Sequence, residues 1–330
     1  MDIIKALKES GLVGLGGAGF STAAKWQAVK DSCEKKRFVV CNLSEGEPGV
    51  FKDEFVIQRH LSKMISGIEI AAEFVNAQKS YIFLNDKYKY YQKKIEKNLK
   101  GKKIEVFIDN GRYLCGEETV MLQVMEGKTR QPRLKPPYPT NSGLFGYPTL
   151  INNAETFYRV KLIADGDYQP KRFYSLFGDY IPKKVVESDL SSTVEEIINS
   201  EKILSKIKFA RIGGLSGCFL PRREFNKQIT GTGSVEIFGK RRNVFNALCQ
   251  SIIFLKNESC GKCTPCREGI YRIAEELNNI SESKSLWDKE EIFSKIKSIA
   301  EAAKESSFCP LGASVANPVI SAINLFPEDF

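Results

Sequence analysis

Four cysteines are the residues whose spacing points most directly to chemistry. Cys260, Cys263 and Cys266 each stand two residues apart, and a distant fourth, Cys309, is followed at once by proline. Three thiolates in a C-x2-C-x2-C pattern with a remote C-P pair are typical of cubane iron–sulfur clusters. The short spacing lets three sulfurs converge on one centre, while the fourth arrives from another element. The pattern predicts a [4Fe–4S] cluster and electron transfer.

A structural zinc site is the alternative for these thiols, because four thiolates also suit Zn²⁺. Zinc ribbons usually present two C-x2-C pairs, whereas here three thiols are clustered and one is remote. The iron–sulfur interpretation is therefore favoured. The remaining cysteines show no ligand spacing and are expected to be packed thiols: Cys33, Cys41, Cys115, Cys218 and Cys249.

A glycine-rich segment at residues 14–19, GLGGAG, precedes a helical pattern at residues 22–30. Such a loop lets backbone N–H groups and a helix N-terminus face a phosphate, because no side chain crowds the anion. Lys25 in the helix can add a positive charge. A tight structural turn is an equal alternative. Unlike a dinucleotide fingerprint, the loop does not follow a strand, since residues 3–10 predict a helix.

Acidic residues follow two predicted strands, where parallel α/β sheets bind ligands. Glu45 and Glu47 come after the strand at 37–41, and their carboxylates suit ribose hydroxyls or ring N–H groups. Glu117 and Glu118 begin a helix after the strand at 103–109. Turn residues and helix-dipole partners, respectively, are the structural alternatives. Asn152, Asn153 and Thr156 likewise resemble a helix N-cap region.

Composition excludes several classes of protein. The chain has 330 residues, a net charge of +9 and a single histidine, His60, on a predicted helix; this scarcity argues against Ser-His-Asp triads and against multi-histidine zinc sites. The lysines are scattered without interleaved aromatics, which predicts a solvated surface and no nucleic-acid groove. No apolar run is long enough for a transmembrane helix, and the N-terminus lacks a signal sequence. A cytoplasmic location with reduced or metal-bound cysteines is expected.

The predicted elements divide the chain into three parts. The first alternates strands (37–41, 80–85, 103–109) with helices (22–30, 53–76 with a kink near 66–67, 88–99, 115–126), which indicates a parallel α/β sheet. Residues 130–153 are proline-rich, and little regular structure is expected there. Short strands (173–177, 183–186, 209–212, 234–237) around a helix at 192–199 predict a small α+β unit. From residue 242 the pattern is helical.

Taken in order, these motifs resemble the flavoprotein subunit of NADH dehydrogenases. This is the 51 kDa-type subunit of respiratory complex I, shared with diaphorase subunits of NAD-linked hydrogenases and formate dehydrogenases. The likeness is densest at residues 14–25, 41–53, 113–119, 132–156, 258–269 and 307–312. It implies an FMN- and NAD(H)-binding Rossmann-like domain at 1–170, a β-grasp domain at 171–241 and a helical [4Fe–4S]-binding domain at 242–330.

The resemblance also implies the roles of individual residues. The implied FMN contacts are Gly16, Gly17, Lys25, Asn42, Gly116, Glu117, Asn152, Asn153 and Thr156. The implied NAD(H) contacts are Gly17, Ala18, Phe20, Lys25, Glu47, Tyr113, Glu118 and Tyr138. Phe20 and Tyr138 would stack adenine, and Glu47 near the adenosine ribose would disfavour a 2′-phosphate, hence NADP. Glu45 is grouped with these cofactor-binding residues, and the four clustered cysteines would hold the cluster.

The implied reaction moves a hydride from NADH to FMN and then single electrons to the cluster, so no side-chain nucleophile is required. The sequence shows neither a thioredoxin-like [2Fe–2S] module nor a ferredoxin module, so an external acceptor is expected. A small [2Fe–2S] subunit of the 24 kDa type within a larger redox complex is the implied partner. An electron-bifurcating diaphorase module and a non-catalytic scaffold or relay are the alternative functions.

Four positions depart from the family pattern. Val13 and Leu15 replace arginines of the glycine loop, Ser44 replaces an aspartate expected near the flavin, and Ala28 replaces an aromatic residue. The glycine loop also looks like that of the Rnf-complex C subunit, which lacks the cysteine block and therefore ranks second. These departures bear on dinucleotide binding and on the redox properties of the flavin more than on the set of cofactors.

Overall fold

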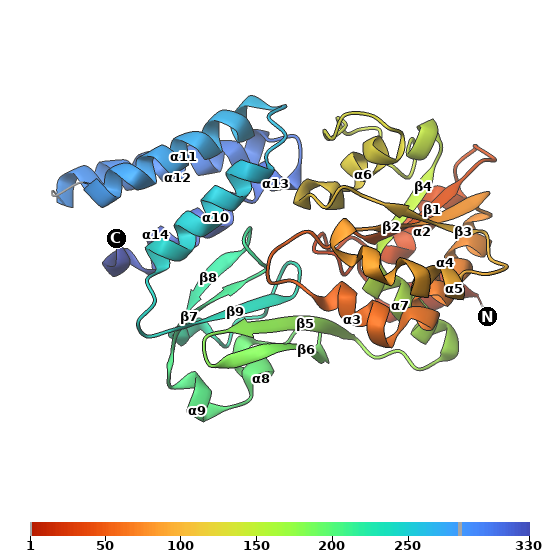
Figure 1. Ribbon diagram of the computed structural model, residues 1–330, viewed down its shortest axis with the longest axis horizontal. Helices are drawn as coiled ribbons and strands as arrows, with labels where there is room; N and C mark the ends of the chain where they lie inside the picture. The colour runs from red at the N-terminus through yellow and green to blue at the C-terminus, as the bar shows by residue number, and fades with distance from the viewer. Residues whose placement is uncertain (1, 283–285) are drawn as a thin grey trace. The chain divides into compact units, whose positions relative to one another are not determined.

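The computed structural model describes residues 2–282 and 286–330 (Figure 1). By their contacts, these residues form two compact units. The first comprises the chain up to Gly46, Val50–Phe173 and Glu187–Leu190. The second comprises Glu47–Gly49, Tyr174–Val186 and the chain from Ser191 onward. The finer division into three domains stays a prediction.

A four-stranded parallel sheet forms the centre of the first unit. Its strands are β1 (Phe38–Leu43), β2 (Lys79–Leu84), β3 (Ile104–Ile108) and β4 (Thr149–Asn153). They lie in the order β3-β2-β1-β4, and every pairing is parallel. β1 is almost wholly buried because its continuous apolar run packs on both faces of the sheet. The predicted Rossmann-like α/β class is confirmed.

Helices cover both faces of this sheet (Figure 1). They are α1 (Ile3–Ser10), α2 (Thr22–Lys30), α3 (Lys52–Arg59), α4 (Leu61–Val75), α5 (Gln92–Asn98), α6 (Glu118–Met125) and α7 (Ala154–Asp165). Helices α4 and α7 pack on each other and on β1. On the other face, Met121 and Leu122 of α6 join Phe38, Val40 and Ile151 in one apolar cluster.

The predicted kink near residues 66–67 is wrong, because the chain breaks at His60, between α3 and α4. Gly67 lies inside α4, where a Cβ atom would come 1.9 Å from the carbonyl oxygen of Phe157. This glycine therefore permits close packing of α4 on α7. The His60 ring stacks on Tyr158 and Phe173, with centroids 4.4 Å and 5.6 Å away. The chain's one histidine therefore packs among aromatic rings of the first unit.

Strand β4 corrects a second prediction, since it lies within the segment expected to lack regular structure. It has only five residues and follows Pro148. Its partner is β1, with Val39 opposite Leu150 and Cys41 opposite Asn152. A strand this short forms because a buried neighbour completes its hydrogen bonds, which local sequence does not reveal.

A five-stranded sheet forms most of the second unit outside its helices. It contains β5 (Lys171–Gly178), β6 (Ile181–Asp189), β7 (Ile207–Ile212), β8 (Cys218–Pro221) and β9 (Ser234–Gly239). The strand order is β6-β5-β9-β7-β8; β9 runs parallel to β5 and antiparallel to β7. Helices α8 (Val194–Ile198) and α9 (Glu201–Leu204) follow β6. This is the expected β-grasp arrangement, with β8 and α9 as unpredicted additions.

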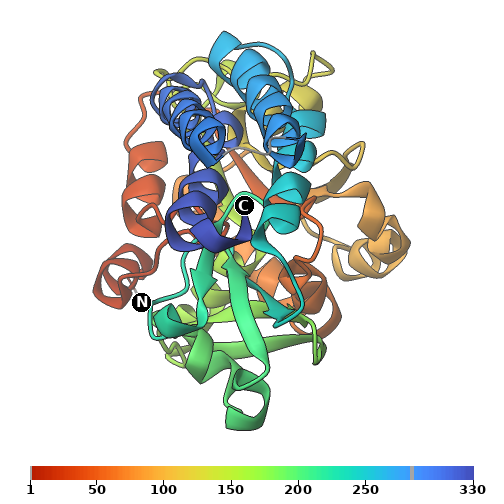
Figure 2. The ribbon, with the colours of Figure 1, turned by 90° about the vertical axis from the view of Figure 1, so that its left-hand side faces the viewer.

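The second unit ends in helices α10 (Val244–Glu258), α11 (Thr264–Glu282), α12 (Leu286–Ser306), α13 (Pro310–Ala313) and α14 (Ala316–Leu325). Helices α11 and α12 run side by side (Figures 1 and 2). Ile273 and Leu277 of α11 are buried, as are Ile296 and Ala300 of α12. The amphipathic pattern of both helices thus packs into one helical layer.

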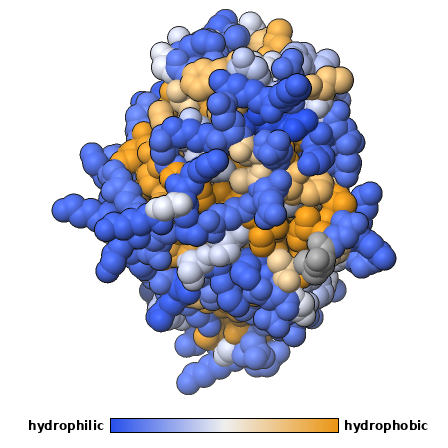
Figure 3. Space-filling model, turned by 90° about the vertical axis from the view of Figure 1, so that its right-hand side faces the viewer, coloured by the Kyte–Doolittle hydropathy of each residue, from blue (hydrophilic) through white to orange (hydrophobic). Residues whose placement is uncertain are grey.

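The basic residues are largely solvated, as predicted. Helix α5 exposes Lys93, Lys94 and Lys97 and buries Ile95. The face shown in Figure 3 is mostly hydrophilic, with apolar side chains gathered in separate places. Among the described residues, no helix is both long and apolar enough to cross a membrane.

Candidate functional site

The carboxyl ends of β1 and β4 form the switch point of the first sheet, because β1 has β2 on one side and β4 on the other. Doubly wound sheets bind ligands in the crevice at this point. Asn42 of β1 and Asn153 of β4 lie opposite each other in register, with Asn152 beside them. Three of the predicted FMN-binding residues thus come together at the crevice.

The asparagine side chains hold the surrounding loops in place. Asn42 donates from Nδ2 to the carbonyl oxygen of Gly116 at 2.9 Å, and its Oδ1 accepts from Ser44 N at 2.9 Å. The Oδ1 atom of Asn152 accepts from the indole Nε1 of the buried Trp26 at 3.0 Å. These amides therefore fix the loops and the helix that surround the carboxyl ends of β1 and β4.

The glycine loop is closed at its base by two hydrogen bonds. Gly14 N donates to the carbonyl oxygen of Phe20 at 2.8 Å, and Leu15 N donates to Thr156 Oγ1 at 3.0 Å. Thr156 is completely buried on α7. Its hydroxyl thus anchors the loop to the helix that follows β4. An FMN contact at Thr156 stays a prediction.

The tip of this loop is exposed from Gly16 to Phe20. Gly17 and Gly19 have φ angles of 116° and 64°, which favour glycine. A Cβ atom on Gly16 would lie 3.2 Å from Cβ of Asn153, so the loop passes close to the crevice. An exposed backbone without bulky side chains fits a phosphate-bearing ligand such as FMN.

Lys25 and Glu118 form an ion pair across the first unit. The Lys25 ammonium group lies 2.5 Å from Oε1 of Glu118 and donates to the carbonyl oxygen of Ile151 at 3.1 Å. The predicted cation is therefore held at the end of β4, with its charge balanced by Glu118. A phosphate bound here would have to share Lys25 with that carboxylate.

Two close backbone approaches join the segment after β1 to the segment before α6. A Cβ atom on Gly46 would lie 2.7 Å from Cα of Tyr113, and one on Gly116 would lie 3.1 Å from the carbonyl oxygen of Ser44. Both positions are therefore restricted to small residues. Glu117 caps α6 by accepting from the backbone N–H groups of Thr119 and Val120. Its carboxylate has this structural role besides the predicted cofactor contact.

Two predicted adenine-stacking residues present aromatic surface to solvent. The side chains of Phe20 and Tyr138 are 57% and 56% exposed, respectively. Flat aromatic rings can stack on nucleobases, and this exposure leaves both rings accessible to a ligand. Their exposure fits the predicted contact with a dinucleotide.

Glu47 groups with the second unit. Its carboxylate is buried and accepts from Ser216 N at 3.3 Å. A Cβ atom on Gly214 would lie 2.2 Å from Glu47 Oε1, so this glycine makes room for the carboxylate. A ribose contact at Glu47 would require this hydrogen bond to be shared or exchanged.

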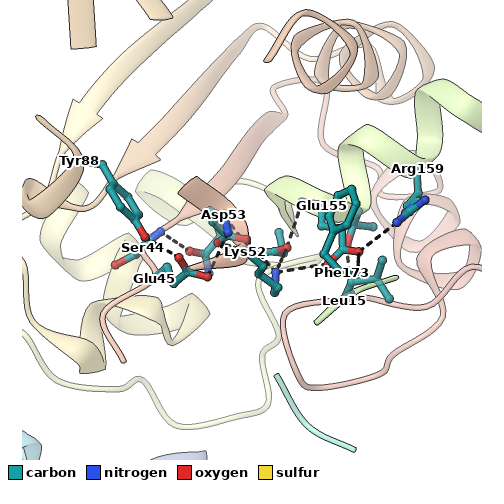
Figure 4. A network of polar contacts seen from close by, with 12 residues as sticks. Leu15, Ser44, Glu45, Lys52, Asp53, Tyr88, Glu155, Arg159 and Phe173 are labelled. Atoms are coloured by element: carbon teal, nitrogen blue, oxygen red, sulfur yellow. Dashed lines mark hydrogen bonds and ion pairs between the residues drawn. The ribbon is translucent and has the colours of Figure 1, made fainter. Parts of the chain in front are cut away.

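Sequence analysis missed a buried network of charged residues next to the crevice (Figure 4). At its centre, Lys52 donates to Asp53 Oδ1 at 2.7 Å and to Asn153 Oδ1 at 2.9 Å, and lies 3.5 Å from Glu155. Asn153 also donates to Asp53 at 2.9 Å. Asn153 is thereby fixed from two sides. The motif after Glu47 contained Lys52 and Asp53, but only their burial reveals the network.

Glu45 belongs to the same network. Tyr88 donates its hydroxyl to Glu45 Oε2 at 2.5 Å, and Asp53 N donates to Glu45 Oε1 at 3.1 Å. Burial, together with the negative charge of Asp53, raises the pKa of Glu45 to about 7. Nearby Lys52 opposes this shift. Glu45 is thus a buried carboxyl group of the network, whereas a direct cofactor contact stays a prediction.

The Glu45→Gln variant should lose a pH-dependent part of the stability. The unfolded chain releases the Glu45 proton near pH 4.5, whereas the folded chain keeps it to about pH 7. Between these values the folded state binds more protons, so its stability falls as pH rises, by roughly 3 kcal/mol in total. Urea unfolding at several pH values measures this slope. Glu9→Gln, on the surface of α1, should retain it, and an unchanged slope in Glu45→Gln would contradict the assignment.

Ser44, where the resemblance predicts an aspartate, is buried and donates its hydroxyl to Asp109 Oδ2 at 2.5 Å. Asp109 directly follows β3 and also accepts from Gly111 N. Burial raises the pKa of Asp109, while these donors oppose the shift. The Asp109 carboxylate at the end of β3 therefore lies beside position 44. The position of Asp109 at the end of a predicted strand was the feature of the sequence that could have identified it as a candidate site residue.

The four predicted cluster ligands all lie in the second unit. Cys260 and Cys263 lie between α10 and α11, Cys266 in the first turn of α11, and Cys309 at the N-cap of α13. Cys263, Cys266 and Cys309 are 6%, 4% and 7% exposed. Burial, with a smaller contribution from the charges of the other three thiols, raises the pKa of the Cys266 thiol to about 12, and the hydrogen bond with Ser259 opposes this shift.

Two contacts bring Cys266 near the segments of the other cysteines: its Sγ lies 3.3 Å from Oγ of Ser259, which precedes Cys260, and a Cβ atom on Gly312, three residues after Cys309, would lie 2.8 Å from its Cβ. A bound metal cluster would stabilise their thiolate forms, which burial alone disfavours. Within the described ranges, no group of three His, Cys, Asp or Glu side chains is arranged to hold a metal ion. A cubane cluster takes one thiolate at each of its four irons, so its ligands need not converge on a single metal ion. Their number, burial and chemistry fit a [4Fe–4S] group.

Comparison with known proteins matches both regions of the chain. Residues 7–162 match the Nuo51 FMN-binding domain, and residues 246–330 match the NADH-ubiquinone oxidoreductase-F iron-sulfur binding region. The F subunit of the NADH-quinone oxidoreductase of Aquifex aeolicus is 31% identical over 367 aligned positions, covering 100% of this chain and 85% of that protein. The corresponding F subunit of Streptomyces coelicolor is 30% identical and also covers the whole chain.

Subunits of NAD-reducing hydrogenases are also similar to this chain. The alpha subunit of the NAD-reducing hydrogenase HoxS of Cupriavidus necator is 28% identical over 99% of this chain and 59% of that protein. A crystal structure of an NAD⁺-reducing [NiFe]-hydrogenase in the H2-reduced state matches with a TM-score of 0.92 at 30% identity. The match covers 99% of this chain, which spans 62% of the hydrogenase chain.

The glycine loop at the sheet switch point, the four thiols and these matches over nearly the whole of this chain agree with one another. The chain belongs to the family of NADH-quinone oxidoreductase F subunits, with their FMN-binding domain and their [4Fe–4S]-binding region.

Proposed function

We propose that this chain is an NADH-oxidising flavoprotein subunit that passes electrons through its iron–sulfur cluster to a partner. The observation that carries the proposal is the presence, in one chain, of an exposed glycine loop at a sheet switch point and of four clustered thiols. The first arrangement suits a flavin nucleotide, and the second suits a one-electron carrier.

When bound, FMN supplies the redox chemistry by accepting a hydride from NADH and releasing electrons singly. The residues of the chain bind FMN and NADH and orient them toward each other. The backbone of Gly16 and Gly17 would face phosphate, while Asn42, Asn152 and Asn153 line the crevice that the network in Figure 4 holds rigid. Cofactor contacts at Gly116, Glu117 and Thr156 are part of the same proposal.

The dinucleotide would lie against the exposed loop, with Phe20 and Tyr138 stacking adenine. Lys25 would supply positive charge, and Glu118 would keep that ammonium group in position. Ala18 and Tyr113 complete this proposed surface. Glu47 would repel the 2′-phosphate of NADPH by its negative charge, so NADH is the proposed substrate.

The partner we propose is a small [2Fe–2S] subunit of the 24 kDa type within a larger redox complex. Support comes from the names of the relatives, which are themselves subunits of an NADH-quinone oxidoreductase and of a hydrogenase. We propose a cytoplasmic location, because cluster assembly on four thiolates requires a reducing compartment.

An anaerobic optical titration of the FMN- and cluster-loaded chain tests this function. NADH should bleach the flavin band at about one equivalent, and a reduced-cluster EPR signal should appear. NADPH should require a concentration more than about tenfold higher, because one unpaired charge contact exceeds about 1.4 kcal/mol. A loaded chain whose flavin ignores both dinucleotides would overturn the dehydrogenase proposal.

A matched pair of variants localises the binding surface. Lys25→Met should raise the NADH concentration needed for half-bleaching by about tenfold or more, because it removes the cation held beside Glu118. Lys30→Met changes an exposed lysine on the same helix and should leave the titration unchanged. Equal behaviour of the two variants would remove Lys25 from the site.

A further inference from the structure

Ser259 stands directly before the first cluster cysteine and contacts another of the cysteines. Its Oγ lies 3.3 Å from Sγ of Cys266, and it also accepts from Gly261 N at 3.3 Å. Because the backbone N–H group occupies an acceptor position of the hydroxyl oxygen, its hydrogen remains available for the sulfur. A ligating thiolate has no hydrogen of its own, so the hydroxyl must be the donor.

Ser307 provides a second hydroxyl near the same cysteine. Its Oγ is buried and has no hydrogen-bond partner in the part of the chain that the structure describes. A buried hydroxyl left without a partner costs about 1–3 kcal/mol, so its retention calls for an explanation. A side chain that served only to fill apolar space here would not need a hydroxyl group.

Gly312 shows where this hydroxyl lies. A Cβ atom on Gly312 would meet Ser307 Oγ at 2.4 Å and Cβ of Cys266 at 2.8 Å. The Ser307 hydroxyl and the Cys266 side chain therefore flank the same small space, which glycine leaves open. A cluster held by Cys266 would bring acceptor sulfurs to this otherwise unpartnered donor.

Hydrogen bonds to the sulfurs of an iron–sulfur cluster affect its reduction potential. An added electron makes the sulfurs more negative, and a donor stabilises a more negative acceptor more strongly. Two hydroxyl donors at one corner of a cluster should therefore favour its reduced form. The effect is electrostatic and requires no proton transfer.

We propose that Ser259 and Ser307 donate hydrogen bonds to the cluster at its Cys266 corner and thereby raise its reduction potential. The inference rests on the proposed ligation of the cluster by Cys266. It makes the two serines tuning residues that favour electron flow from the flavin to the cluster.

An EPR-monitored redox titration of the 330-residue chain loaded with FMN and cluster, with chemical mediators and dithionite but without dinucleotide, tests this inference. Ser259→Ala and Ser307→Ala should each make cluster reduction about tenfold less favourable, which is a shift of about 59 mV to lower potential. Ser259→Thr keeps the hydroxyl and should restore the original potential. Iron content and EPR spin count show whether each variant still carries its cluster.

Ser306→Ala is the matched control, because the exposed Ser306 hydroxyl donates to the carbonyl oxygen of Ala302 instead. Its potential should remain unchanged. Unchanged potentials in Ser259→Ala and Ser307→Ala, with clusters intact, would overturn this inference and leave the proposed NADH oxidation standing. A wild-type chain that binds no cluster would overturn both. Failure of NADH to bleach the flavin would affect the proposed function alone.

Discussion

The Cys266→Ala variant is expected to lose the EPR signal of the reduced cluster while NADH still bleaches its flavin. Cys266 is 4% exposed, and its removal takes away one of the four proposed cluster ligands at a site that is largely closed to solvent. Changes outside the first ligand shell already cost about 10–100-fold in metal affinity, and loss of a ligand should exceed that. Iron per chain, EPR and anaerobic flavin bleaching measure the two functions separately.

Cys249→Ala is the control for this experiment. Cys249 is a half-buried thiol of α10, and burial raises its pKa without a contribution from the cluster thiols. Its removal should leave iron content and EPR unchanged. Full iron content in Cys266→Ala would exclude Cys266 as a ligand, and loss of flavin from that variant would show that the two cofactor regions do not act independently.

The Lys52→Met variant is expected to lose more unfolding free energy than any other variant of the first unit that is described here. The Lys52 side chain is 3% exposed and faces Asp53 and Glu155, whose side chains are 4% and 0% exposed. Removing one member of a buried ion pair costs about 3–5 kcal/mol, because the remaining charges stay buried without compensation. Urea unfolding monitored by tryptophan fluorescence measures the loss.

A surface lysine and a double variant test this explanation. Lys5 lies 3.9 Å from Glu9, with both side chains largely exposed, so Lys5→Met should change the stability by less than about 0.5 kcal/mol. Adding Asp53→Asn to Lys52→Met should recover part of the loss by removing one uncompensated charge. A loss below about 1 kcal/mol in Lys52→Met would contradict the burial of this network.

The amino-acid sequence by itself determined the features that depend on neighbouring residues. Helix α2 occupies the predicted residues because Ser21 caps its start, and the strands β1, β2 and β3 lie within two residues of their predicted bounds. The cysteine motif could be recognised because its three-residue intervals require no knowledge of the fold. The same is true of the glycine loop, whose positive φ angles demand glycine.

Tertiary structure alone decided the features that join distant segments. Strand β4 was missed because its five residues form a strand only beside β1. The kink was expected near Gly67 because glycine inside a helical pattern often marks a break. In the fold, the lack of a side chain at Gly67 instead lets the backbone of α7 pack closely against α4.

Burial and electrostatics around the sites follow the same rule. In the sequence, Ser44 indicates only that a carboxylate is missing, whereas the fold places the Asp109 carboxylate beside it. The sequence does not show that Lys52 is buried, whereas in the fold its ammonium group lies among acidic residues. The sequence does not place Ser307 beside Cys266, whereas in the fold both side chains flank the space at Gly312. In each case the partners are far apart in the sequence, and only chain folding sets the short distances and low dielectric on which their interaction depends.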